Sequence, residues 1–298
     1  MTQQFAIMAH RLQFPASPGD IQDMLYSEIT GFLSTNGISC RSITAGRKEF
    51  ILAESTHAGS HRGIFILPAA IRACTYREAE EEYLERKEAK EQLAGDGGWP
   101  VVTIAEDRWR RPGTLYRERL LSHLGLFRPV AARNCEVRRT GKDTAGAFLQ
   151  NSHSYGMSSC RYCYAIYGKG ETVPAGVATF SNARRWIKGG REIRSYEWVR
   201  YASSPGTRVI GGMGKLLSRF INDVRPDDIM SYADLEWSDG RAYRTLGFAE
   251  EGMKAPVLFG INREDWSRHP VSSQPVPGHG LYFMNDGSLK FRLKLTWY

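Results

Sequence analysis

The stretch RVIGGMGKLLSRFINDV (residues 208–224) sets the expected fold of the second half of the chain. It places Gly211, Gly212 and Gly214 between a predicted strand and an amphipathic helix over 215–224. Glycines at such a corner let consecutive backbone N–H groups face one anion, and the helix N-terminus adds a partial positive charge. The corner is therefore a candidate pyrophosphate site. The alternative is that the glycines only permit tight packing of strand against helix.

The corner matches neither of the two common glycine-rich nucleotide motifs. The GxxxxGK[ST] frame of a P-loop and the GxGxxG of a dinucleotide-binding fold are both missing from it. After the helix comes a predicted strand over 229–233 that runs into Asp234, followed by a predicted helix over 240–246 that carries Tyr243. We expect these two side chains to lie close to the glycine corner, at the mouth of a splayed sheet.

The order strand, glycine loop, helix, strand and short helix ending in Tyr243-x-x-Leu-Gly-Phe248 is similar to the GNAT superfamily of N-acetyltransferases. The resemblance covers about 130–265. It implies a mixed, V-splayed sheet whose glycine loop holds the pyrophosphate of acetyl-CoA or another acyl-CoA, with Tyr243 as general acid. The implied cofactor-binding residues are Arg208, Gly211, Gly212, Gly214 and Lys215. The family form Gln/Arg-x-x-Gly-x-Gly/Ala is met in part, because Met213 takes the last place when the motif begins at Arg208.

A narrower resemblance rests on NSHSYG (151–156), Arg200 in an arginine-rich stretch, and SYAD (231–234). These segments look like Mom-type DNA-modification proteins and related phage GNAT-like modules. That family implies transfer of a carbamoylmethyl group to the exocyclic amine of adenine in DNA. By position, it implies four active-site residues, which are His153, Tyr155, Asp234 and Tyr243. Ser154 separates the histidine from the tyrosine, a departure from the family's His-Tyr-Ser order.

Transfer of an acyl-type group to an amine needs a base, an acid for the leaving thiolate, and a donor for the developing oxyanion. Tyr243 is the candidate acid. Asp234, Glu236 or His153 is the candidate base, or holds an iron or a water, although no clear motif predicts a metal site. Each residue also has a purely structural interpretation: Tyr243 as core, Asp234 as a turn cap and His153 as a helix cap.

The positive charge of the chain is unevenly spread. The chain carries 40 Lys and Arg against 32 Asp and Glu, a net charge of +8, and residues 1–129 contribute none of that excess. An excess confined to 130–298 points to an anionic partner such as nucleic acid or a phosphate-rich cofactor. The alternative is compositional drift.

The stretch RRWIKGGREIRSYEWVR (184–200) concentrates this charge. Its basic residues are suited to phosphates, and the interleaved Trp186, Tyr196 and Trp198 are suited to stacking on bases. Alternatively, Tyr196 and Trp198 share one strand face and belong to the core. The predicted nucleic-acid contacts, with DNA as the expected partner, are Arg184, Arg185, Lys188, Arg191, Arg194 and Arg200.

The 298 residues predict an α+β chain in three parts. Residues 1–100 form an α+β region of unknown role with a solvated connector helix over 77–93, and a boundary follows near 95–100. Residues 101–129 form a strand–helix linker, in which Glu106 and Asp107 are typical of a cap or solvated turn. Residues 130–298 form the GNAT-like domain, a mixed sheet flanked by helices, extended by a final hairpin through 285–287.

The cysteines and the N-terminus indicate the compartment. Five cysteines, an odd number in a long chain, favour reduced thiols. Cys160 and Cys163 form a CxxC without a second pair and are interpreted as structural, with their thiols on opposite strand faces. The start MTQQFAIMAH lacks a secretory pattern and no window is apolar enough to cross a membrane, so we expect a cytoplasmic protein.

Together these features predict a GNAT-like transferase that moves an acyl-type group to an amine, with a nucleobase amine in DNA as the acceptor. Two alternatives remain open at this point. One is an acetyl-CoA-dependent N-acetyltransferase of a small molecule or protein, and the other is a non-enzymatic nucleic-acid-binding module on the same fold. The sequence leaves the donor group, a metal requirement and the oligomeric state open.

Overall fold

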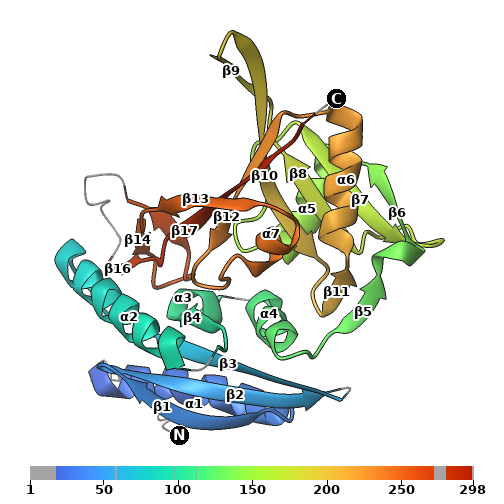
Figure 1. The fold of residues 1–298 in the computed structure, drawn as a ribbon. Helices are drawn as coiled ribbons and strands as arrows, with labels where there is room; N and C mark the ends of the chain where they lie inside the picture. Colours follow the sequence, from blue (N-terminus) through green and yellow to red (C-terminus); the bar gives the residue numbers. More distant parts are fainter. Residues whose placement is uncertain (1–17, 58, 97, 112, 272–279, 297–298) are drawn as a thin grey trace, which may run out of the picture.

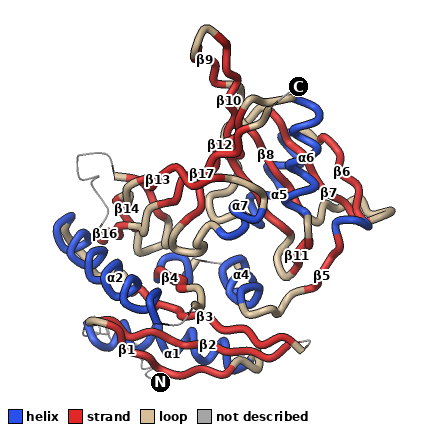
Figure 2. Tube along the Cα trace, viewed as in Figure 1, coloured by secondary structure: helices blue, strands red, loops and turns tan. Residues whose placement is uncertain are grey.

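The computed structural model describes residues 18–57, 59–96, 98–111, 113–271 and 280–296. Two main sheets organise these residues, and Figures 1 and 2 show α2 and α4 in the space between them. The predicted α+β class, with a mixed sheet flanked by helices, is confirmed. Among the described residues, no helix combines the length and the apolar character needed to cross a membrane.

The N-terminal sheet has the order β1-β2-β3-β4, antiparallel except for the parallel pair β3–β4. Its strands alternate buried side chains between two faces: Ile51 and Ile66 pack toward α1, while Phe50 and Leu67 pack toward α2. The elements of this part are α1 (Pro18–Thr35), β1 (Ser39–Ala45), β2 (Lys48–His57), β3 (Ser60–Ala69), α2 (Tyr76–Asp96), β4 (Val101–Ala105), α3 (Glu106–Arg110) and α4 (Leu115–His123).

The larger sheet has the order β13-β17-β12-β10-β8-β7-β6, and β9 pairs with the protruding start of β10. Only β10 and β12 are parallel, and α6 connects them. Its elements are β6 (Cys135–Arg139), α5 (Lys142–Ser152), β7 (Tyr162–Gly168), β8 (Gly176–Phe180), β9 (Arg184–Lys188), β10 (Arg191–Ser203), α6 (Gly212–Val224), β12 (Asp228–Asp234), α7 (Arg241–Thr245), β13 (Ala249–Lys254) and β17 (Ser288–Lys294).

Two smaller sheets complete the fold. The parallel pair β5–β11 lies beside α6, and the sheet β15-β14-β16 is inserted between β13 and β17. Their elements are β5 (Arg128–Ala131), the 3-10 turn η1 (Ala132–Asn134), β11 (Thr207–Ile210), β14 (Leu258–Ile261), β15 (Arg268–Pro270) and β16 (Leu281–Met284).

The parallel strands β10 and β12 separate soon after they meet. They pair over residues 195–197 and 228–230, after which β10 continues beside β8 and β12 beside β17. A β-bulge between Trp198 and Arg200 takes Val199 out of the β8 ladder. The sheet is therefore mixed and splayed at this point, as the family resemblance implies.

The apolar face of α6 holds the splayed sheet together. Phe220 stacks on Phe180 with ring centroids 3.8 Å apart, and Tyr162 and Tyr196 pack edge-on against it. Burial of such rings, at roughly 25 cal/mol per Å² of apolar surface, fixes where the helix begins. The glycine corner is thereby held at the end of the sheet where β10 and β12 diverge.

Three sequence predictions need correction. Strand β4 pairs with β3, so the boundary predicted near 95–100 lies inside the N-terminal sheet. The helix predicted as solvated over 77–93 packs on that sheet through Ala89 and Leu93. The hairpin predicted through 285–287 is wrong, because β16 pairs with β14 while β17 pairs with β12 and β13.

A buried ion cluster joins the two parts of the molecule. The Arg268 side chain, 2% exposed, donates to both carboxylate oxygens of Asp107 at 2.8 and 2.7 Å and to Glu236 at 3.1 Å. Asp107 is therefore buried rather than in a solvated turn, as is Glu106, which accepts the backbone N–H of Ile71. The cluster ties α3, the end of β12 and β15 to one another.

We predict that Arg268→Met lowers the free energy of unfolding by about 3–5 kcal/mol, because two buried carboxylates lose their counter-charge. Urea unfolding of the full chain measures this. The control is Arg263→Met, which removes an exposed arginine of the same insertion and should leave stability nearly unchanged. Equal stability of the two variants would contradict a structural role for the cluster.

Candidate functional site

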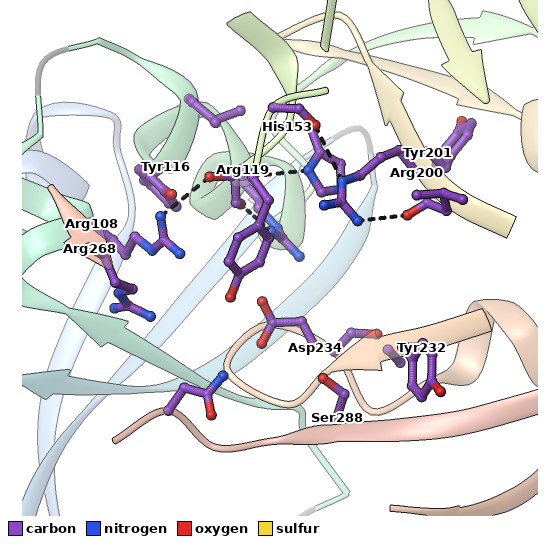
Figure 3. Close-up of a pocket in the computed structure, with 18 of the residues that line it drawn as sticks. Arg108, Tyr116, Arg119, His153, Arg200, Tyr201, Tyr232, Asp234, Arg268 and Ser288 are labelled. Atoms are coloured by element: carbon purple, nitrogen blue, oxygen red, sulfur yellow. Dashed lines mark hydrogen bonds between the residues drawn. The ribbon is translucent and has the colours of Figure 1, made fainter. Parts of the chain in front are cut away.

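A cleft of about 1210 Å³ opens where β10 and β12 diverge. Six parts of the chain line most of it: α3–α4, the end of α5 with the segment after it, the bulged part of β10, the start of α6, the end of β12 with α7, and residues from the end of β13 to β17. His153, Tyr155, Asp234 and Tyr243, predicted from widely separated segments, all line this one cleft. Figure 3 shows His153 and Asp234 on opposite sides of it.

His153 follows the last residue of α5 and is fixed by a local turn. The Tyr155 backbone N–H donates to its Nδ1 at 3.1 Å, so the neutral ring carries its proton on Nε2. Burial, followed by the nearby Arg200, Arg119 and Arg108, lowers the His153 pKa to about 3. His153 is therefore a neutral hydrogen-bond donor at pH 7. Among the roles predicted for His153, which were base, holder of an iron or a water, and helix cap, this geometry disfavours that of base.

The Tyr155 ring lies between two arginines. The Arg108 guanidinium carbon is 4.9 Å from the ring centroid and that of Arg200 is 5.8 Å away. Burial, followed by Asp234 and Glu236, raises the Tyr155 pKa to about 12. The hydroxyl consequently keeps its proton at pH 7 and can donate it in a hydrogen bond inside the cleft.

Asp234 lies at the end of β12 and turns its carboxylate toward the cleft (Figure 3). One carboxylate oxygen accepts the Glu236 backbone N–H at 3.0 Å, which orients the group. Within the described ranges no ion pair involves Asp234, whereas Glu236 is committed to Arg268. Asp234 is thus the carboxylate best placed to accept a proton from a bound amine.

Tyr243 on α7 has a packed ring and is also one of the residues that line the cleft. Its ring stacks on Phe291 with centroids 5.2 Å apart, and burial raises its pKa. Its oxygen lies 2.8 Å from Ser231 Oγ, which is also 2.9 Å from the Trp198 carbonyl. Because Ser231 carries one proton, it can donate either to that carbonyl or to the tyrosine oxygen. Tyr243 is therefore partly a core residue, as the structural alternative predicted, and also a cleft residue.

The three glycines at the start of α6 have different environments. A Cβ on Gly212 would lie 2.8 Å from Val209 Cβ, so that glycine permits tight packing. Gly211 is exposed, has φ +78°, and caps α6 without a side-chain hydrogen bond. The first N–H groups of α6 have no acceptor within the helix. The next residue of the corner, Met213, lines the cleft.

Two other predicted cofactor contacts lie elsewhere. The Lys215 ammonium donates to the carbonyls of Ala132 at 2.9 Å and Cys135 at 2.5 Å, tying α6 to η1 and β6. Arg208 is exposed on β11, with its guanidinium carbon 5.4 Å from the Phe127 ring centroid. Neither residue lines the cleft. The three glycines Gly211, Gly212 and Gly214 do not line it either, and Met213 is the residue of the corner that reaches the cleft.

The predicted nucleic-acid residues fall in two places. The hairpin β9–β10 projects from the body (Figure 1) and carries five of them, which are Arg184, Arg185, Lys188, Arg191 and Arg194. Arg200 instead lines the cleft. Arg191 and Arg194 both pair with Asp227, which reduces their charge. Tyr196 and Trp198 belong to the core, as the structural alternative predicted, and Trp198 also lines the cleft, while Trp186 is exposed on the hairpin.

The predicted CxxC is a buried pair of free thiols. The two sulfur atoms lie 3.4 Å apart, and burial raises the Cys163 pKa to about 12. The prediction that they occupy opposite strand faces is wrong, because Cys160 precedes β7 and only Cys163 lies in the strand. In the part of the chain that the structure describes, no cluster of three or more candidate ligands could hold a metal ion.

Sequence reasoning missed three cleft residues from α3 and α4, namely Arg108, Tyr116 and Arg119. All three lie in the segment predicted as a linker. Their spacing in the sequence carries no motif, because they reach the cleft only through the packing of α3 and α4 against the end of β12. The sequence offered one signal for them: Arg108 lies just beyond the end of a predicted strand, where functional side chains are often found.

No family model matches the chain, and no curated protein sequence matches it. Solved acetyltransferase structures are similar to about half of it. NAA60 of Arabidopsis thaliana in complex with acetyl-CoA is 10% identical, with 54% of this chain and 99% of that chain covered and a TM-score of 0.37.

The ribosomal-protein-S5-alanine acetyltransferase of Vibrio fischeri is 11% identical (54% and 93% covered, TM-score 0.34). A GNAT family acetyltransferase of Bacillus cereus is 13% identical (55% and 99%, TM-score 0.29). Because these TM-scores lie below 0.5, the likeness by itself assigns no function to the chain. The Mom-type resemblance stays a prediction.

We predict that His153 stays neutral throughout the range in which histidines ordinarily titrate. Its folded pKa of about 3 lies below its ordinary value of 6.5, so the unfolded chain binds the proton first. The stability that its neutral form contributes is present above pH 6.5 and is lost as the pH falls toward 3. Nitrogen NMR of the imidazole should show no titration between about pH 5 and pH 8.

The variant His153→Asn identifies the imidazole signals of His153, because these signals are missing from its spectrum. A His153 midpoint near the ordinary histidine value would contradict the described environment.

Proposed function

We propose that this protein is an acyl-CoA-dependent transferase that moves an acyl-type group to an amine, and that the acceptor is a nucleobase amine in DNA. One observation carries the proposal: Asp234 and Tyr243 meet in a single cleft, at the splay of β10 and β12, with the α6 N-terminus at its edge. The arrangement supplies a proton acceptor, a proton donor and an anion site around one space.

The residues at the corner fit an acyl-CoA pyrophosphate. Gly211 is exposed and lacks a Cβ, and the N–H groups of the first turn of α6 are available to phosphate oxygens. Gly211, Met213 and Gly214 would hold the group, with Gly212 shaping the turn. When bound, an acyl-CoA supplies a thioester, whose carbonyl carbon is electrophilic. The bulge takes Val199 out of the β8 ladder, and Val199 lines the cleft, so its backbone N–H would suit a hydrogen bond to an oxyanion.

The side chains of the cleft divide the proton transfers between them. Asp234 accepts a proton from the acceptor amine as the new bond to nitrogen forms. Tyr243 donates its hydroxyl proton to the departing sulfur, and Ser231 can then turn its hydroxyl from the Trp198 carbonyl to the phenolate oxygen. The His153 Nε2–H and the Tyr155 hydroxyl remain as donors that orient the acceptor.

The basic hairpin supports DNA as the acceptor. A projecting two-stranded ribbon has the shape that a major groove admits, and its arginines suit phosphates. Trp186 and Ile187 are 40% and 70% exposed on this ribbon, where an isolated protein gains nothing from apolar side chains. If the target base must leave the duplex, the cleft rather than the ribbon would receive it.

The cofactor part of the proposal is tested with a matched pair, Gly211→Asn and Gly211→Asp. Both side chains tolerate a positive φ and cap helices, so they differ mainly by one negative charge. We expect acetyl-CoA to bind Gly211→Asp at least about tenfold more weakly than Gly211→Asn, because the carboxylate repels the pyrophosphate. Calorimetric titration measures both, and equal affinities would remove the pyrophosphate from this corner.

The acceptor part is tested by mass spectrometry of nucleosides from DNA of cells that express the protein. We expect a modified nucleoside with the wild type. Asp234→Asn and Tyr243→Phe should each lower its amount by about 10²–10⁴-fold, because each removes one proton transfer. A nucleoside profile that is the same for the wild type and Asp234→Asn would count against DNA and favour a small-molecule or protein acceptor.

A further inference from the structure

Three arginines meet around the segment that carries His153 and Tyr155 (Figure 3). Arg108 donates to the Ser154 carbonyl at 3.3 Å, and Arg119 donates to the Ser154 hydroxyl at 3.2 Å. Arg200 donates to the Gly156 carbonyl at 3.3 Å and to the Val199 carbonyl at 2.9 Å. All three line the cleft, and together they are called the arginine wall.

The charge of the arginine wall is not neutralised. Its hydrogen bonds go to neutral oxygens, and no ion pair joins Arg119 or Arg200 to a carboxylate among the described residues. Arg108 has only Asp107, at 3.9 Å, which is already engaged with Arg268. The carboxylates that face the cleft are Asp234, on the opposite side, and Glu197. Partly buried cations without counter-charge are costly, and a bound anion would relieve that cost.

A second observation points to a ligand at the same place. Tyr116, on α4 beside the arginine wall, is 7% exposed and lines the cleft. Its hydroxyl is buried and has no hydrogen-bond partner among the residues that the structure describes. Buried hydroxyls are nearly always hydrogen-bonded, so an unpaired one on a residue that lines the cleft is a candidate partner for a ligand atom. The Arg108 guanidinium carbon lies 5.6 Å from the Tyr116 ring centroid, so the Tyr116 side chain lies beside the arginine wall.

We propose that the arginine wall and Tyr116 bind a phosphate group of the acceptor, namely the phosphate next to the base that is modified. This inference rests on the proposed function and specifies its substrate. Guanidinium groups match phosphate oxygens in geometry and charge, and Asp234 faces the wall from across the cleft. A nucleotide bound by its phosphate at the wall therefore presents its base amine toward Asp234.

The proposal also gives the N-terminal part of the chain a role. Arg108, Tyr116 and Arg119 come from α3 and α4, while Arg200 and the base-facing Asp234 come from the splayed sheet. The phosphate subsite exists only where the two parts meet. The size of the cleft, about 1210 Å³, leaves room for an acceptor nucleotide beside the end of an acyl-CoA.

The test compares two short single-stranded DNA probes of identical sequence with a central adenine. One has ordinary phosphodiesters, and in the other the two phosphates that flank the adenine are neutral methylphosphonates. Fluorescence anisotropy with the full chain should show about tenfold tighter binding of the charged probe, the effect of one strong charge-assisted contact. Deoxyadenosine monophosphate should compete for this site and deoxyadenosine should not.

Three variants test whether the arginine wall causes the preference for the charged probe. Arg119→Gln should abolish the preference for the charged probe. Arg117→Gln, the same change on the same helix but outside the cleft, should keep it. Ser154→Ala removes the hydroxyl that Arg119 contacts but leaves the guanidinium, and it should also keep the preference, which separates ligand binding from the support of a loop.

Equal binding of the two probes by the wild type, or an unchanged preference in Arg119→Gln, would overturn the phosphate subsite. The acyl transfer itself is assayed separately, with acetyl-CoA and the charged probe. A preference that persists without any transfer supports the subsite and counts against the proposed reaction. Transfer without a preference supports the reaction and overturns the subsite.

Discussion

The separation of β10 from β12 after three paired residues is the constraint on which the rest of the molecule depends. A parallel pair joined by a crossover helix is ordinarily covered on both faces and leaves no opening. Here the bulge at Val199 and the pairing of each strand with a different neighbour force the two strands apart. The gap places Val199, Asp234 and Tyr243 around one space, and Met213 at the start of α6 also lines it.

The Arg268 cluster explains how two parts of the chain form one site. An isolated pair of carboxylates at Asp107 and Glu236 would be costly to bury, so the insertion that carries Arg268 is required for α3 to dock at the end of β12. Docking of α3 and α4 then brings Arg108 and Arg119 into the cleft. The cluster that stabilises the junction thus places the arginines that charge the acceptor side of the cleft.

Local patterns predicted much of the second half of the chain. The apolar spacing of 215–224 gave α6, and the turn at 168–171 gave the hairpin β7–β8. The four candidate side chains His153, Tyr155, Asp234 and Tyr243 were found from a resemblance and from strand and helix ends. Three of the errors share one cause: the partners of β4 and β17, and those of Asp107, are distant in the chain, and periodicity does not report partners.

The sequence by itself determined which segments form helices and strands, where the glycine corner falls and which half of the chain carries the excess charge, because these depend on neighbours within a few residues. Only the tertiary structure decided that the N-terminal part supplies one wall of the cleft. It also decided that Lys215 ties α6 to η1. Arg200, which was predicted together with the basic residues of the hairpin, lines the cleft. The physical reason is that charge and burial act through space, so a side chain's role depends on groups that folding brings beside it.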